Sequence, residues 1–153
     1  MTFISNIPWK EGRTTQTLVI HCSAYDFRPY FQEFITDGLK LTEYDVLAIP
    51  GGIQVLTLAY FLPKLESTVK KMISFLVEKH DLKRIILVGH HDCGWYKDFR
   101  FGPVHIDLAK RQLDDLKTVA KQLREVHGLA IEAYYGDVTD KTGVVNFDIV
   151  SLA

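Results

Sequence analysis

The residues best suited to chemistry are one histidine and two cysteines, each at the end of an expected strand. His90 and Cys93 lie in the hexapeptide 89–94, Gly-His-His-Asp-Cys-Gly, which follows a short apolar run. Such a run, bounded by charge and glycine, predicts a buried parallel strand. Its carboxyl end is where ligands bind in open α/β sheets. Cys22 ends the apolar, β-branched segment 17–22. Because imidazole nitrogen and thiolate sulfur are zinc ligands, we predict that Cys22, His90 and Cys93 hold one zinc ion.

Three protein ligands leave one position of a tetrahedral zinc site open, which is typical of catalytic sites. Zinc lowers the pKa of bound water from about 15.7 to about 7, so that a hydroxide nucleophile forms near neutral pH. Asp26 and Arg28 are the nearest polar pair. We expect Asp26 to accept a hydrogen bond from the zinc-bound hydroxide, while Arg28 keeps that carboxylate ionised and oriented. Alternatively, Asp26 is a fourth ligand and closes the site.

The sequence resembles the β-class carbonic anhydrases over roughly residues 16–150. The hexapeptide 89–94 is similar to the Gly-His-x-x-Cys-Gly motif of that family, and this is the most specific part of the resemblance. Cys22, followed by Asp26 and Arg28, is similar to the family motif Cys-x-Asp-x-Arg.

The resemblance implies a function and a role for each of these residues. Zinc is bound by Cys22, His90 and Cys93, Asp26 and Arg28 form a catalytic pair, and the reaction is the reversible hydration of carbon dioxide to bicarbonate. One residue separates cysteine from aspartate in the family, but three separate Cys22 from Asp26. In an extended strand this difference moves a side chain by about 6–7 Å, so we expect weak or lost hydration with less effect on zinc binding.

Two segments are expected to line the zinc site. The double glycine Gly51-Gly52 follows a predicted strand and permits the positive φ and close backbone approach of a site-lining turn. The loop 95–104 is rich in aromatic residues, which we predict to form a cover over the site. The residues of this cover are Trp95, Tyr96, Phe99 and Phe101.

The same residues are compatible with other functions. The chain could be a noncatalytic zinc protein whose site is closed by Asp26, or a zinc hydrolase of carbonyl sulfide or carbon disulfide. His21-Cys22-x5-Arg28 also has the spacing of the cysteine-dependent phosphatases. The loop 23–27 argues against a phosphatase, because it has no glycine for a phosphate-binding nest and Asp26 would repel phosphate.

Composition limits the class of protein. Of the 153 residues, 47% are hydrophobic and the formal net charge is −1, so we expect one folded domain over 1–153 and no nucleic acid or membrane partner. Two cysteines in a potential ligand set favour metal chemistry over disulfides, and hence a cytoplasmic location. The partners expected are carbon dioxide or bicarbonate and, through the apolar segment 53–62, a second copy in a homodimer or higher homo-oligomer.

Strands alternate with helices along the chain, which predicts an α/β domain of the β-carbonic anhydrase type. We expect a mostly parallel central sheet, helices on both faces and a carboxyl-terminal edge strand. The strands are predicted at 17–22, 44–49, 84–89, 131–135 and 144–150. Helices are predicted from Pro29 to Gly38, from Pro63 to His80 and over 106–126.

Overall fold

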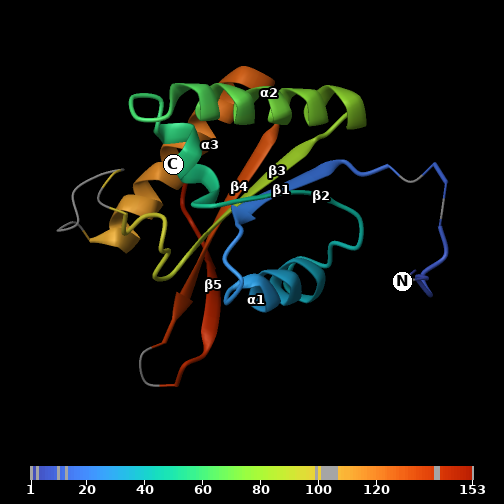
Figure 1. The fold of residues 1–153 in the computed structure, drawn as a ribbon, viewed down its shortest axis with the longest axis horizontal. Coiled ribbons are helices and arrows are strands. Elements are labelled where there is room, and N and C mark those ends of the chain that lie inside the picture. Colours follow the sequence, from blue (N-terminus) through green and yellow to red (C-terminus); the bar gives the residue numbers. More distant parts are fainter. Residues whose placement is uncertain are drawn as a thin grey trace.

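Five strands form one sheet that crosses the middle of the molecule (Figure 1). They are β1 (Thr17–Cys22), β2 (Asp45–Ile49), β3 (Arg84–His90), β4 (Ala130–Val138) and β5 (Val145–Ile149). Their spatial order is β2-β1-β3-β4-β5; the first four run parallel, and β5 is an antiparallel edge strand beside β4. The sheet predicted from the sequence is therefore confirmed. The computed structural model describes residues 2, 4–9, 11–12, 14–98, 100, 107–139 and 142–152.

Helices cover both faces of the sheet, as predicted (Figure 1). The long helices α2 (Pro63–His80) and α3 (Leu108–His127), with the 3₁₀ helix η2 (Gly52–Thr57), pack on one face. The short helix α1 (Arg28–Glu33), continued by the π-helical turn η1 (Phe34–Gly38), packs on the other. The molecule is a single α/β domain with three layers.

Alternating side chains of the central strands fill two separate cores. In β1, Leu18 and Ile20 point to the face covered by α2 and α3, whereas Val19 points to the face covered by α1. Successive side chains of a strand leave opposite faces of the sheet, so a strand covered on both sides is apolar at most positions. This explains the apolar runs in the middle of β1 and β3.

Local sequence signals account for the ends of the helices. Pro63 begins α2, where its missing N–H has no partner to lose. The carboxylate of Asp107 accepts a hydrogen bond from the backbone N–H of Lys110 and caps α3. Gly128 has a φ of 67° at the other end of α3, a conformation that glycine adopts without strain.

The apolar segment 53–62 divides between the core and the surface. Ile53, Val55 and Leu56 are buried against the sheet, whereas Tyr60 and Phe61 are exposed. The first half of the segment is therefore part of the core of this chain, and apolar side chains are exposed only at its end. Within the part of the chain that the structure describes, no helix is long and apolar enough to cross a membrane.

The order of the strands creates one switch point, between β1 and β3. The chain leaves β1 to form β2 on one side and returns to form β3 on the other side, so the connections diverge there. In open α/β sheets the crevice at the carboxyl ends of such strands is where ligands bind. Cys22 and His90 are the last residues of these two strands. The fold thus brings together residues that are 68 positions apart.

The central core can be tested through α2. We expect Ile73→Ala to lower the free energy of unfolding by about 2–5 kcal/mol, because Ile73 is fully buried and its loss leaves a cavity. Lys71→Ala, on the exposed side of the same helix, should change it by less than about 0.5 kcal/mol. Urea unfolding of both variants measures the difference; equal stabilities would contradict the packing described for α2.

Candidate metal centre

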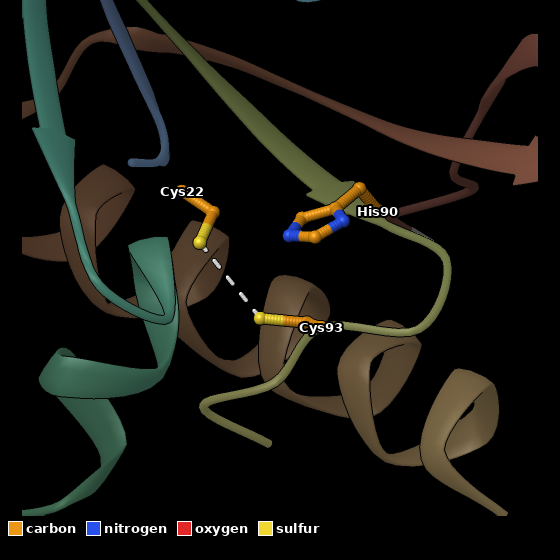
Figure 2. A group of neighbouring side chains, drawn as sticks. All are labelled: Cys22, His90 and Cys93. Atoms are coloured by element: carbon orange, nitrogen blue, oxygen red, sulfur yellow. Dashed lines mark hydrogen bonds between the residues drawn. The ribbon is translucent and has the colours of Figure 1, made fainter. Parts of the chain in front are cut away.

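Cys22, His90 and Cys93 converge at the carboxyl ends of β1 and β3 (Figure 2). One donor atom of each residue lies within 4.8 Å of the donor atoms of the other two, and the two sulfur atoms are 3.8 Å apart. All three side chains are buried. The structure therefore assembles the three predicted ligands into one group that could hold a metal ion.

The orientation of His90 suits a metal ligand. Its Nδ1 lies 2.8 Å from the carbonyl oxygen of His91, so Nδ1 carries the proton and donates it in a hydrogen bond. Nε2 then carries the free electron pair; it is buried and has no hydrogen-bond partner within the described residues. A buried polar atom without a partner is costly, and a histidine that binds metal through one nitrogen commonly donates from the other. The residues fit a zinc ion.

The two sulfur atoms share a hydrogen bond. The pKa of Cys22 is lowered, chiefly because the Cys93 thiol donates this hydrogen bond to it. The pKa of Cys93 is raised for the same reason, since its proton is held by Cys22, and burial raises it further. Cys22 is thus the cysteine of the pair that loses its proton more readily, and a thiolate is the form that binds metal.

A glycine turn packs closely against Cys22. Gly51 and Gly52 have φ values of 73° and 54°. A Cβ atom on Gly52 would lie 3.0 Å from the backbone nitrogen of Cys22, and one on Gly51 would lie 2.2 Å from the Trp95 ring. The backbone N–H groups of Ala24 and Gly51 donate hydrogen bonds that also lower the pKa of Cys22. The double glycine lines the site, as the sequence predicts.

Aromatic side chains from the α1 side form one wall of the site. The ring of Phe27 lies 4.5 Å from the His90 ring, centroid to centroid, and the ring of Phe31 lies 5.6 Å from it at a steep angle. Both phenylalanines are buried. Of the expected aromatic cover, Trp95 lies over Gly51 and Tyr96 is buried, while Phe99 and Phe101 lie outside the described residues. The wall keeps water from the imidazole.

Asp26, in the loop that leads from β1 to α1, and Arg28, the first residue of α1, are both exposed. The Asp26 carboxylate accepts a hydrogen bond from the backbone N–H of Phe27, and it is not a member of the donor group formed by the cysteines and His90. Among the ion pairs of the described residues, none joins Asp26 to Arg28. Their catalytic role stays a prediction.

Two polar residues of α3 contribute to the site and escaped the sequence analysis. The Gln112 side chain bonds to the main chain of His90, and the Asp115 carboxylate accepts a hydrogen bond from the Tyr96 hydroxyl at 2.9 Å. Both belong to the stripe of α3 that also carries the buried Leu116. A polar residue within a mostly apolar stripe of a helix could have indicated these contacts, because such a side chain needs a buried hydrogen-bond partner.

Comparison with known proteins identifies the family. A protein-family model described as "Putative carbonic anhydrase" matches residues 12–142. The chain therefore belongs to the carbonic anhydrase family that this description names. No curated protein sequence matches it at a significant level.

Solved structures of β-carbonic anhydrases share the fold. The enzyme from Trichomonas vaginalis aligns with a TM-score of 0.57 at 15% identity, covering 95% of this chain and 88% of its own. The enzyme from Aspergillus fumigatus aligns at 0.55 with 16% identity, covering 93% and 78%. One of two tetrameric β-carbonic anhydrases from Sordaria macrospora aligns at 0.54 with 16% identity, covering 89% and 81%. At these identities the likeness concerns the fold.

The half-buried carboxylate of Asp115 next to the site makes stability depend on pH. Burial raises the pKa of Asp115 in the folded protein above its ordinary value. The folded state therefore holds the proton more tightly, and the free energy of unfolding should fall as pH rises through the raised pKa. Asp115→Asn should remove this fall and still accept the hydrogen bond of Tyr96.

Urea unfolding of the wild type and Asp115→Asn between about pH 4 and about pH 8 measures the effect, since the ordinary pKa of aspartate is about 3.9. Glu125→Gln, at an exposed position of the same helix, is the control and should follow the wild type. A fall of equal size in wild type and Asp115→Asn would contradict the prediction.

Proposed function

We propose that this chain is a zinc-dependent enzyme of the lyase type that hydrates carbon dioxide reversibly to bicarbonate. The observation that carries the proposal is the buried group of Cys22, His90 and Cys93, with Nε2 of His90 left unpartnered among the described residues. Two thiolates and an imidazole are a zinc ligand set with one position open to solvent or substrate. The family match and the β-carbonic anhydrase fold agree with this chemistry.

Each residue of the site has a defined task in this proposal. Cys22 and Cys93 neutralise the charge of the ion, and His90 completes the protein ligands. The carbonyl oxygen of His91 keeps the His90 proton on Nδ1, which leaves Nε2 free to bind. When bound, zinc supplies the Lewis acidity that makes water a nucleophile near neutral pH. Phe27 keeps bulk water from the imidazole side.

Asp26 and Arg28 remain the proposed catalytic pair, in a reaction that we expect to be slow. Both are exposed, and the two extra residues between Cys22 and Asp26 alter the loop that carries them. Exposure of a carboxylate weakens its electrostatic effect on a reaction, because water screens it. This same observation favours a second candidate function, a zinc-binding protein of the same fold without catalytic activity.

The phosphatase alternative receives less support. A phosphatase needs its cysteine facing a phosphate-binding loop, with the arginine beside it. The Cys22 sulfur instead faces the sulfur of Cys93, and Arg28 is exposed. For hydrolysis of carbonyl sulfide or carbon disulfide, no observation favours one of these substrates over carbon dioxide.

We also propose a homo-oligomer. The Sordaria macrospora relatives are described as tetrameric, and Tyr60 and Phe61 present apolar surface at the end of the 53–62 segment. Sedimentation of the purified protein tests this proposal; a monomer at micromolar concentration would contradict it.

Metal content tests the ligand set. We expect the wild type to contain one zinc per chain, and His90→Ala and Cys93→Ser to contain little, because each removes a donor atom. His91→Ala is a matched control, since the neighbouring imidazole is half-exposed and pairs with Asp137 outside the donor group. Elemental analysis after gel filtration measures the content. Equal zinc in wild type and Cys93→Ser would remove Cys93 from the site.

Stopped-flow hydration of carbon dioxide tests the activity. We expect zinc-loaded wild type to exceed the buffer rate and Cys93→Ser to match it. Asp26→Asn should keep its zinc and hydrate carbon dioxide more slowly than the wild type, because it loses the proposed hydrogen-bond partner of the zinc-bound hydroxide. Asp37→Asn, an exposed aspartate of η1, is the control. A zinc-loaded wild type at the buffer rate would establish the noncatalytic alternative.

A further inference from the structure

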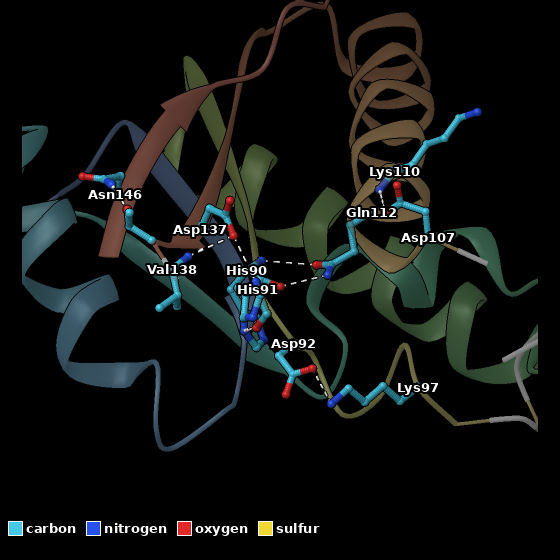
Figure 3. A network of polar contacts seen from close by, with 11 residues as sticks. His90, His91, Asp92, Lys97, Asp107, Lys110, Gln112, Asp137, Val138 and Asn146 are labelled. Carbon is cyan, nitrogen blue, oxygen red and sulfur yellow. Dashed lines mark hydrogen bonds and ion pairs between the residues drawn. The ribbon is translucent and has the colours of Figure 1, made fainter. Parts of the chain in front are cut away.

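The side chain of Gln112 is bound to the main chain of the ligand His90 (Figure 3). Its Oε1 accepts a hydrogen bond from the backbone N–H of His90 at 3.2 Å, and its Nε2 donates one to the backbone carbonyl of the same residue at 2.8 Å. The side chain is only 2% exposed. One buried amide thus satisfies both peptide groups of a predicted metal ligand.

These peptide groups would otherwise lack a partner. Successive residues of β3 bond alternately to the strands on its two sides, and the N–H of His91 donates to Gly136 of β4. The backbone N–H and C=O of His90 therefore point toward β1. The pairing of β1 with β3 ends before this position, at His21 and Val88. Unpaired buried peptide groups are costly. The Gln112 amide takes the place of the strand that is missing there.

Gly89 allows α3 to come close enough for this contact. A Cβ atom at Gly89 would lie 3.3 Å from Oε1 of Gln112 and 3.2 Å from Cδ1 of Leu116, both tighter than ordinary contacts. A Cβ atom at this position would require the Gln112 amide and the Leu116 side chain to shift by a few tenths of an ångström. Glycine at position 89 thus favours the close approach of α3 to His90.

A second contact joins α3 to the turn that carries Cys93. Tyr96 lies three residues after Cys93, is 3% exposed, and donates its hydroxyl hydrogen to the Asp115 carboxylate at 2.9 Å. The backbone N–H of Tyr96 also donates a hydrogen bond to the Cys93 sulfur, which lowers the pKa of that thiol. Gln112 and Asp115 are three residues apart and so lie on one face of α3.

We propose that α3 is the positioning element of the metal centre, with Gln112 fixing the main chain of His90 and Asp115 fixing the Cys93 turn through Tyr96. The inference rests on the proposed function, since it assumes that His90 and Cys93 bind the ion. Neither Gln112 nor Asp115 is a ligand. Residues that orient ligands in this way typically change metal affinity by about 10–100-fold.

Gln112→Met tests the proposal, because methionine has a similar length and volume but forms neither hydrogen bond. We expect about 10–100-fold weaker zinc binding, measured by competition with a chelator of known affinity. Gln122→Met is the matched control, an exposed glutamine on the same helix, and should bind zinc as the wild type does. Equal affinity of Gln112→Met and the wild type would overturn the role of Gln112.

A second measurement separates positioning from general stability. Amide hydrogen exchange on the metal-free proteins should show faster exchange at His90 in Gln112→Met, with the core strand residue Leu87 still protected. Unchanged exchange at His90 would overturn the role of Gln112, whether or not the wild type binds zinc. A wild type that binds no zinc would refute the proposed function, and this outcome is independent of the exchange result. If Gln112→Met does not fold, Tyr96→Phe keeps the ring and removes only the hydroxyl; unchanged zinc affinity there would overturn the role of Asp115.

Discussion

The burial of two sulfur atoms and one imidazole nitrogen at a single point is the constraint on which this structure depends. Polar atoms removed from water must be paired, and the shared thiol proton and the carbonyl oxygen of His91 pair only some of these atoms. The Nε2 atom of His90 has no hydrogen-bond partner in the described part of the chain. The sheet, the glycine turn and the phenylalanine wall all serve to hold this polar group inside a mostly apolar interior.

Much of the fold was predictable because it follows from local patterns. Continuous apolar runs indicated strands buried on both faces, and Pro63 and Gly128 marked helix ends within one or two residues. The convergence of Cys22, His90 and Cys93 was predictable because parallel strands end at one edge of the sheet. Sequence periodicity therefore predicted the structure up to the ends of the strands.

The surroundings of the ligands depend on distant contacts that no local pattern encodes. The contact of Gln112 with His90 depends on the approach of α3 to β3, which the spacing along the chain does not specify. Phe27 lies in a predicted loop, and no sequence pattern indicates that its ring packs against the imidazole of His90. The positions of Asp26 and Arg28 depend on how a short loop turns outward after β1. Strand ends are set by periodicity, whereas loops and helix approaches are set by tertiary packing.

The separation of the candidate ligands along the chain has a consequence for folding. The two cysteines are 71 residues apart, and β2, α2 and β3 lie between them. An ion that bridges them acts as a removable crosslink over a long loop, and such a link restricts the unfolded chain more than a short one does. Binding that occurs only in the native state shifts the folding equilibrium by mass action. The supply of metal in the surrounding solution would then regulate how long each molecule survives proteolysis, quite apart from any turnover of substrate.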